Sequence, residues 1–394
     1  MSITAKVSIS NLEIQELCAK NSRSLPRQAL SSALLPWYEK NKIKHPWRED
    51  WDTFKDPYRI WLSEIMLQQT TLKVVVPAYI KFVAALPNIE VFAQADSALI
   101  RSLAKGLGYY SRFHRMHEAA RALLQNYKNL DQLQWPQTEK QWRELPGIGP
   151  YTAAALASIC NQQRAAVVDG NVERVLCRVF DLRIPVNFPI LKKEFKNYLD
   201  QVIPHFQPGD FNQALMELGQ VICRPSRPLC EKCVLQYNCL AYTRNSQDLA
   251  PQAKLKQVKK QVELAVVIPK LKNRFLITRS GRGGRFLKKE PGFPLVHFEN
   301  EFSQQKFNQY LKNIGNFKQI KEIGYFKHNI TNHKILARCF QVEFDTLNVK
   351  KYDEKMCDFA EEHSEYKLIT LKKIKTSLST SLDQKAFRLI AIEN

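Results

Sequence analysis

The sequence predicts two domains of different class, a mainly α N-terminal domain followed by a separate α+β domain. Apolar residues recur at helical spacing from about Gln28 to Thr243, and Pro and Gly fall between these runs. Residues 246–261 are polar and basic without an apolar face, which is typical of a linker. Beyond them, short β-rich runs such as VELAVVIPK and ARCFQVEF are separated by turns. A chain of 394 residues is also too long for one typical core.

These patterns set the expected boundaries. Residues 1–26 are interpreted as a weakly structured extension, 27–243 as the helical domain, 244–261 as the linker and 262–394 as the α+β domain. No apolar run approaches the roughly 18 residues of a membrane span. The N-terminal residues lack the pattern of a secretory signal or a transit peptide. We therefore expect a cytoplasmic protein without membrane contact, and a monomer.

The charge balance favours an anionic partner. The chain has 59 basic and 38 acidic residues, a formal net charge of +21. A basic surface steers a protein toward polyanions and supplies salt-dependent affinity for DNA that does not depend on sequence. The alternative is a basic protein without a nucleic-acid partner, and composition alone does not distinguish the two.

Four of the nine cysteines lie within 17 residues, in the order Cys223-x6-Cys230-x2-Cys233-x5-Cys239. In a cytosolic chain this clustering points to a metal centre rather than to disulfides. Zinc and a [4Fe–4S] cluster both accept four cysteine ligands. The residues by themselves leave both open.

A Gly-x-Gly turn separates two predicted helices in the segment LPGIGPYTA, residues 145–153. Gly147 and Gly149 let the backbone approach a ligand closely, and the free N–H groups and dipole of the second helix form an anion site. A DNA phosphate suits a chain of this charge. The alternative is an ordinary connection between two helices.

Two carboxylates and one glycine-rich segment are further candidates. Glu64 lies among Trp61, Leu62 and Ile65, and a carboxyl in apolar surroundings keeps its proton and can act as an acid. Asp169 opens the segment DGN, which predicts a turn and a helix start. Simpler interpretations are a solvated helix residue for Glu64, a helix cap for Asp169, and a helix end with core tyrosines for GLGYY at residues 106–110.

Together these motifs resemble the helix-hairpin-helix DNA glycosylases, and most closely the adenine DNA glycosylase (MutY) family. WLSEIMLQQT, GLGYY, LPGIGPYTA, VDGNVERVL and the cysteine spacing occur in the family's order. The resemblance covers residues 28–243 closely and the remainder loosely. It implies a six-helix barrel with an iron–sulfur helical domain, followed by a Nudix-like C-terminal domain. No Nudix hydrolase motif is found, so pyrophosphate hydrolysis is not expected.

The resemblance also implies a reaction. An enzyme of this family flips adenine paired with 8-oxoguanine or guanine out of duplex DNA and removes the base. Glu64 and Asp169 match the catalytic carboxylates, and Tyr151 and Asn171 would orient Asp169 and water. The four cysteines would hold a [4Fe–4S] cluster rather than zinc.

Five residues fall at positions of the family's DNA contacts. Tyr109 matches the wedge that enters the base stack, and Gln69 would fill space on the other side. Trp47 and Arg48 match a segment near the adenine pocket. Thr331 falls where the family has the serine of its 8-oxoguanine-reading loop. Its hydroxyl could serve that purpose, although the flanking aromatic and imidazole of the family are missing.

Tyr151 indicates the subtype. Related endonuclease III glycosylases carry a lysine at this position, and its amine forms the Schiff base that nicks the strand. A tyrosine cannot do this, so we expect base removal without strand cleavage. The remaining alternatives are a bifunctional glycosylase/lyase, and a non-enzymatic iron–sulfur regulator that binds DNA.

Overall fold

The structure is a computed structural model that describes most of the chain. The described residues are 10–22, 26, 28–125, 133–185, 189–252, 260–278, 287, 291–298, 301–330, 333–347, 366–378 and 380–392. Among them, no helix is long and apolar enough to cross a membrane. The chain divides into two compact units, Met1–Lys254 and Leu255–Asn394.

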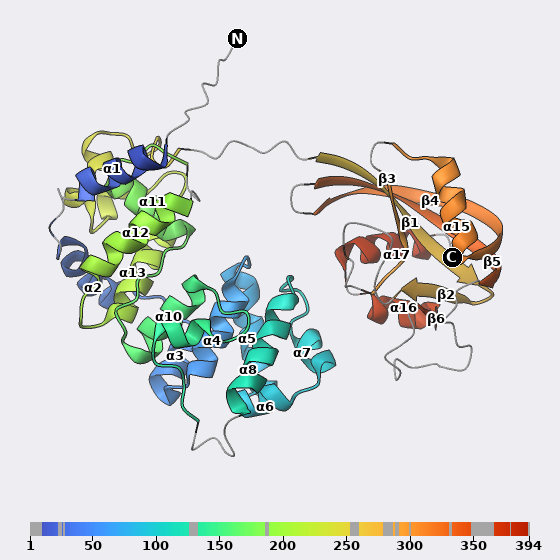
Figure 1. Ribbon diagram of the computed structural model, residues 1–394, viewed down its shortest axis with the longest axis horizontal. Coiled ribbons are helices and arrows are strands. Elements are labelled where there is room, and N and C mark those ends of the chain that lie inside the picture. The colour runs from blue at the N-terminus through green and yellow to red at the C-terminus, as the bar shows by residue number, and fades with distance from the viewer. Residues whose placement is uncertain are drawn as a thin grey trace, which may run out of the picture. The chain divides into compact units, whose positions relative to one another are not determined.

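The regular elements of the first unit are helices (Figure 1). They are α1 (Asn11–Ser22), α2 (Ala29–Asn41), α3 (Pro46–Phe54), α4 (Pro57–Leu67), α5 (Leu72–Ala85), α6 (Ile89–Gln94), α7 (Ser97–Leu103), α8 (Ser111–Leu124), α9 (Glu139–Arg143), α10 (Pro150–Asn161), α11 (Gly170–Val179), α12 (Pro189–Val202), α13 (Pro208–Val221) and α14 (Leu240–Thr243), with short 3-10 turns η2 (Cys230–Lys232) and η3 (Gln236–Asn238).

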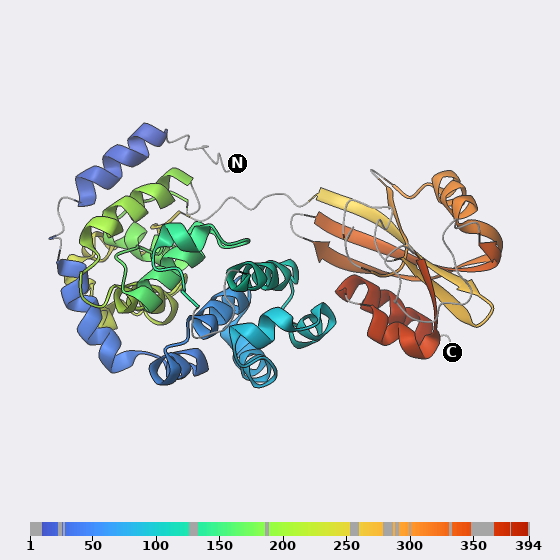
Figure 2. The same ribbon diagram turned by 60° about the horizontal axis from the view of Figure 1, so that its bottom comes forward.

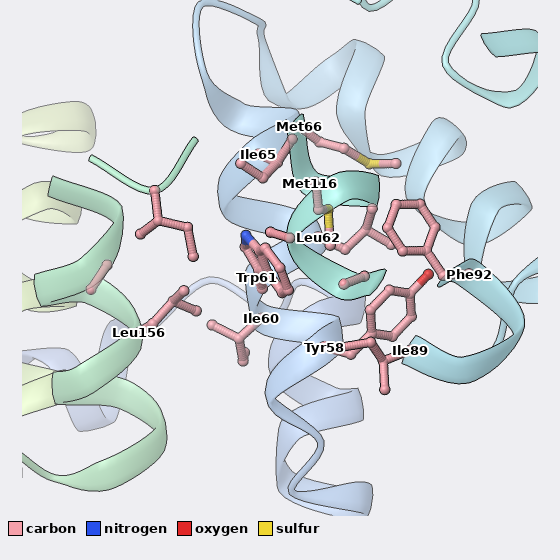
Figure 3. Packing of buried hydrophobic residues seen from close by; sticks show 14 of the residues in the cluster. Tyr58, Ile60, Trp61, Leu62, Ile65, Met66, Ile89, Phe92, Met116 and Leu156 are labelled. Carbon is pink, nitrogen blue, oxygen red and sulfur yellow. The ribbon is translucent and has the colours of Figure 1, made fainter. Parts of the chain in front are cut away.

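Helix α4 runs through the first of two cores in this unit. Every residue from Ile60 to Met66 is buried, so the helix has no solvent-facing stripe. Figure 3 shows Tyr58, Trp61 and Met66 of α4 packed among residues of α6, α8 and α10. A helix that is apolar on nearly all sides requires neighbours on nearly all sides. Its only carboxylate is therefore placed inside the core.

The second core lies between α1, α2, α11, α12 and α13. The extended segment of residues 165–168 joins the two cores and contributes side chains to both. Ala165 and Val167 pack in the first core, whereas Ala166 and Val168 pack in the second. Successive side chains of an extended backbone point to opposite sides, which accounts for this alternation. The segment leads directly into Asp169, the N-cap of α11.

The N-terminal extension differs from the expectation. Residues 10–22 are not weakly structured, because most of them form α1, and Ile14 and Cys18 are buried in the second core. Asn21 Nδ2 donates to the carbonyl of Phe180 at 2.8 Å. Two apolar residues at a spacing of four were enough to dock this short helix on its neighbours.

The expected linker also begins later than residue 244. Residues 244–252 belong to the helical unit. The Arg178 guanidinium donates to the carbonyls of Gln247 and Ala250, and Gln252 N donates to Ile184 O. Hydrogen bonds from the buried Arg178 to backbone carbonyls therefore hold residues 244–252 in place, although this segment is polar and has no apolar face. Residues 253–259 lie outside the described part of the chain.

The second unit is built on a six-stranded sheet. The strand order is β4-β5-β1-β2-β6, with β3 paired to β1; β1 and β5 are parallel, and the other pairs are antiparallel. The elements are β1 (Lys260–Leu271), β2 (Arg274–Thr278), β3 (Leu295–Phe298), α15 (Gln304–Ile314), β4 (Gly315–Ile330), β5 (His333–Leu347), β6 (Tyr366–Thr370), α16 (Leu371–Ser377) and α17 (Ser381–Ile392).

Strand β1 is covered on both faces. Leu264 and Val266 point into the core with α16 and α17, whereas Ala265 and Val267 point into the core with α15 (Figure 2). A strand buried on both faces needs a continuous apolar run rather than alternation, and VELAVVI is such a run. The expected order of a mainly α unit followed by an α+β unit is confirmed. Thr331 lies outside the described residues.

The Gly-x-Gly turn lies between α9 and α10. Gly147 has a φ of +78°, and a Cβ atom placed on it would lie 2.6 Å from Cβ of Arg115. Gly149 has a φ of −85°, and no atom lies within 4 Å of an added Cβ. Only the first glycine is therefore required by the conformation and by the close approach of α8.

We predict that Gly147→Ala lowers the free energy of unfolding of the helical unit by about 1–2 kcal/mol, because an L-residue is strained in the left-handed region. The displacement of Arg115 adds to this loss. All six tryptophans lie in this unit, so urea unfolding followed by tryptophan fluorescence reports on it alone. Gly149→Ala is the matched control and should change stability by less than about 0.5 kcal/mol. Equal losses in the two variants would contradict the assignment.

Candidate functional site

Glu64 is a buried carboxyl. Only 8% of the residue is exposed. The pKa of Glu64 is raised to about 7, mainly by burial; the Tyr151 hydroxyl lowers it, and the nearby charge of Asp169 raises it. Removal from water disfavours the charged form of an acid, so this carboxyl keeps its proton to near-neutral pH. The interpretation as a solvated helix residue does not hold.

Asp169 is the N-cap of α11 and is hydrogen-bonded on both oxygens. Oδ1 accepts from the backbone N–H groups of Asn171 at 2.9 Å and Val172 at 2.8 Å, and Oδ2 accepts from Asn171 Nδ2 at 2.9 Å. The pKa of Asp169 is raised overall, because burial outweighs the lowering by these donors. A carboxylate at a helix N-terminus is also favoured by the helix dipole. Capping and a chemical role are compatible at this residue.

Tyr151 brings the two carboxyls into one cluster. It lies in the first turn of α10, directly after the Gly-x-Gly turn. Its side chain interacts with Glu64, and burial together with the charges of Glu64 and Asp169 raises its pKa. The Tyr151 hydroxyl also lies 3.3 Å from Met216 Sδ on α13. Residues from α4, α10 and the N-cap of α11 thus converge on one polar site, in which Glu64 is buried and Tyr151 and Asp169 are half-buried.

Asn171 links this site to the cysteine loop. Its side-chain oxygen accepts from Arg174 Nη2 at 2.9 Å. Arg174 also donates to the carbonyls of Cys223 at 2.8 Å and Gly219 at 2.7 Å. Continuous hydrogen bonds therefore run from the Asp169 carboxylate to the first cysteine of the loop.

The four clustered cysteines line one pocket. Burial is the largest cause of the raised pKa of Cys233, about 12, and of Cys239, about 11. The buried Arg178 guanidinium lies 3.3 Å from Cys223 Sγ and donates to the carbonyl of Arg224 at 2.7 Å. The pocket thus combines four sulfur atoms with one cation that can offset thiolate charge.

The cysteine pocket is compatible with more than one kind of metal centre. Within the described ranges, no group of three or more His, Cys, Asp or Glu is placed to hold one metal ion. Four thiolates bound to one zinc lie about 2.3 Å from it, which brings the sulfur atoms close together. A cluster of four irons is larger and is also held by four cysteines. Four cysteines around one pocket are compatible with either group.

Gln69 and Tyr109 lie together beside the Gly-x-Gly turn. Both line a pocket that also contains Gly147 and Arg115. Both have left-handed backbones, with φ of 56° at Gln69 and 45° at Tyr109. Tyr109 is 58% exposed although it is a large aromatic residue. Three of the residues expected to contact DNA are therefore brought together on one exposed part of the helical unit.

Trp47 and Arg48 are placed differently from the other expected DNA contacts. Trp47 is buried in the first core, stacked on His45 with ring centroids 4.6 Å apart. The Arg48 guanidinium forms an ion pair with buried Glu217 at 2.8 Å and also donates to Gln213. The charge of Arg48 lowers the pKa of Glu64, so it lies near the carboxyl site, but its donors are engaged inside the protein.

The sequence did not single out Arg112 and Arg178. Both are almost completely buried and donate mainly to backbone carbonyls. Each lies next to a motif that was recognised, since Arg112 follows GLGYY and Arg178 follows VDGNVERVL. A basic residue in a helix of a basic chain is usually solvated, so no pattern distinguished them.

A family model and several known proteins are similar to this chain. Residues 62–186 match the family model of the HhH-GPD superfamily base excision DNA repair proteins. The adenine DNA glycosylase of Mus musculus is 40% identical over 221 residues, 55% of this chain and 42% of the mouse protein. That of Buchnera aphidicola subsp. Baizongia pistaciae is 32% identical over 287 residues, 72% of this chain and 78% of the relative.

Two solved structures are similar to parts of the chain. A thermostable thymine-DNA glycosylase, 28% identical, covers 57% of this chain and 98% of its own, with a TM-score of 0.47. The C-terminal domain of mouse MUTYH, crystallised with human PCNA, is 13% identical and covers 34% of this chain and 88% of its own, with a TM-score of 0.27.

The chain matches only about two fifths of the length of the mammalian relatives, 42% of the mouse and 40% of the human protein. The match to the bacterial relative, in contrast, extends over most of both chains. Together with the helix-hairpin-helix family match, this similarity shows that the chain belongs to the adenine DNA glycosylase family.

Proposed function

We propose that the protein is a monofunctional adenine DNA glycosylase of base excision repair. It would hydrolyse the N-glycosidic bond of adenine mispaired with 8-oxoguanine or guanine in duplex DNA. The observation that carries this proposal is the cluster of buried Glu64 with half-buried Tyr151 and Asp169 in a member of this family. A protein that only binds DNA needs no buried carboxyl with a raised pKa.

The two carboxyls would act in opposite protonation states. Glu64 holds its proton to about pH 7 and would deliver it to the departing adenine, which is otherwise a poor leaving group. The three donors at Asp169 favour its ionised form, and that charge would face the cationic sugar. Asn171 and Tyr151 would keep Asp169 and the attacking water in position.

Base flipping would precede this chemistry, because a stacked adenine cannot reach a buried acid. Tyr109 and Gln69 lie exposed beside the Gly-x-Gly turn and would occupy the gap left in the duplex. The first turn of α10, which starts at Pro150, would hold a backbone phosphate. Reading of 8-oxoguanine by the second unit, through Thr331, remains a prediction, as do a monomeric state and a cytoplasmic location.

Cys223, Cys230, Cys233 and Cys239 would hold one [4Fe–4S] cluster. Four sulfur atoms around a shared pocket, with Arg178 beside Cys223, are the donor set and counter-charge that such a group needs. When bound, the cluster would supply covalent ties that fix the loop from Cys223 to Cys239. The loop in turn positions Arg174 and Asn171 through the Cys223 carbonyl.

The proposal is tested by single-turnover assays on duplexes with adenine opposite 8-oxoguanine, guanine, cytosine and thymine. We expect adenine release opposite 8-oxoguanine and guanine, with the abasic strand intact until alkali is added, because Tyr151 cannot form a Schiff base. Strand cleavage without alkali would instead indicate a glycosylase/lyase. Binding without release from any duplex would indicate a regulator and refute the proposal.

The pKa of Glu64 predicts a pH dependence. The active form carries the proton, so the rate of the chemical step should fall tenfold per pH unit above about pH 7. Glu64→Gln should lower the single-turnover rate by about 10²- to 10⁴-fold and remove this dependence. Glu118→Gln makes the same chemical change on the exposed face of α8 and should have no effect. A wild-type rate that rises steadily above pH 8 would contradict Glu64 as the acid.

The cluster is tested by iron analysis of protein purified without oxygen. We expect about four irons per chain and visible absorption, since four cysteines hold such a cluster. Cys230→Ser should lose most of the iron. Cys339→Ala, a buried cysteine of β5 far from the loop in sequence, should keep it. Stoichiometric zinc without visible absorption would refute the assignment.

A further inference from the structure

One buried guanidinium joins the two loops that carry Gln69 and Tyr109. Arg112 lies at the start of α8 and is 7% exposed. From this position it donates to both loops. Its Nη1 donates to the carbonyls of Met66, at 3.2 Å, and Gln68. Its Nη2 donates to Thr70 Oγ1 and to the carbonyl of Leu107, both at 3.0 Å.

The two loops are also joined directly. Thr70 Oγ1 lies 3.2 Å from the carbonyl of Leu107, so the loop after α4 contacts the loop before α8 without an intermediary. Gln69 lies between Gln68 and Thr70, and Tyr109 follows Leu107 by two residues. Each wedge residue is therefore flanked by a group that Arg112 holds.

These ties matter because both wedge residues have unfavourable backbones. A non-glycine residue with positive φ persists only where the surrounding structure determines it. Gln69 and Tyr109 are both in this region, and Tyr109 is largely exposed, so its own side chain provides little packing to hold it. The bonds from Arg112 fix both loops at once, in addition to the direct contact of Thr70 with Leu107.

The arrangement requires arginine rather than any cation. Burial lowers the pKa of Arg112, and the cost of burying this charge is offset by four oxygen acceptors around a planar group. The two terminal nitrogens of the guanidinium reach separate sets of acceptors. Lysine carries a single ammonium and cannot satisfy the same acceptors in a fixed fork.

We propose that Arg112 is the positioning residue of the wedge. It holds Gln69 and Tyr109 side by side in the conformation in which they fill the gap left by an extruded base. The inference rests on the proposed function, but it concerns base flipping and not bond cleavage. Loss of Arg112 should therefore impair the enzyme on stacked adenine more than on adenine that is already poorly stacked.

The test compares two substrates in single-turnover assays. Arg112→Met removes the donors at similar length. We expect its rate to fall roughly 10- to 100-fold for adenine opposite guanine, the scale set by the cost of unstacking. The rate should fall only a few-fold for adenine opposite an abasic site, where unstacking is cheaper. Tyr109→Ala should show the same pattern.

Flipping is measured separately with 2-aminopurine in place of the mispaired adenine. The Glu64→Gln background prevents release of the base, so the fluorescence increase on binding reports extrusion alone. We expect Arg112→Met to remove most of this increase. Arg121→Met is the matched control, because Arg121 lies on the same helix and also donates to a carbonyl, that of Ala93 at 2.9 Å, away from the wedge. It should leave both readouts unchanged.

Two milder variants cover the case in which Arg112→Met does not fold. Arg112→Lys keeps the charge, and Thr70→Val removes the hydroxyl shared by Arg112 and Leu107. In both variants the rate should fall more for adenine opposite guanine than for adenine opposite an abasic site, but by a smaller factor than in Arg112→Met. Both should keep the iron content of the wild type. Equal losses on both substrates with an unchanged 2-aminopurine signal would overturn the inference. If the wild type releases no adenine, the proposed function fails, and the fluorescence comparison still decides the role of Arg112.

Discussion

The burial of helix α4 on almost every side is the constraint on which the site depends. A helix with one exposed face would place a carboxyl in water, where it ionises near its usual pKa. Here the neighbours of Trp61 and Met66 close around the helix, and Glu64 is enclosed with them. The core that stabilises the helical unit therefore also sets the protonation state of the proposed acid. Packing and chemistry are not separable at this position.

The extended segment before Asp169 has a comparable double role. Its alternating side chains belong to two cores, which fixes its direction as it enters α11. Asp169 then caps the helix, and its position follows from the junction of the cores. Through Asn171 and Arg174 the same carboxylate is connected to the cysteine loop. Changes in that loop would reach the carboxylate through hydrogen bonds rather than through direct contact.

The exposed residues beside the Gly-x-Gly turn follow a different rule. Gln69 and Tyr109 have strained backbones with positive φ. The hydrogen bonds from Arg112 to the carbonyls of Gln68 and Leu107 hold their loops in place. A buried cation bound to carbonyls is costly to form, but it holds two loops with one side chain. Trp47 and Arg48 show the contrast, since Trp47 is buried in the first core and Arg48 forms an ion pair with buried Glu217.

The sequence by itself determined the order of the two fold classes, the Gly-x-Gly turn, the four-cysteine set and the family, because these depend on periodicity and on residues at fixed local spacing. Tertiary structure decided whether Glu64 is buried, since one helix sequence does not reveal how many neighbours surround it. It also decided that α1 packs on the helical unit, that this unit extends to Gln252, and that Arg112 donates hydrogen bonds to two loops. Each of these outcomes depends on partners distant in sequence, and a local pattern contains no information about where such partners lie.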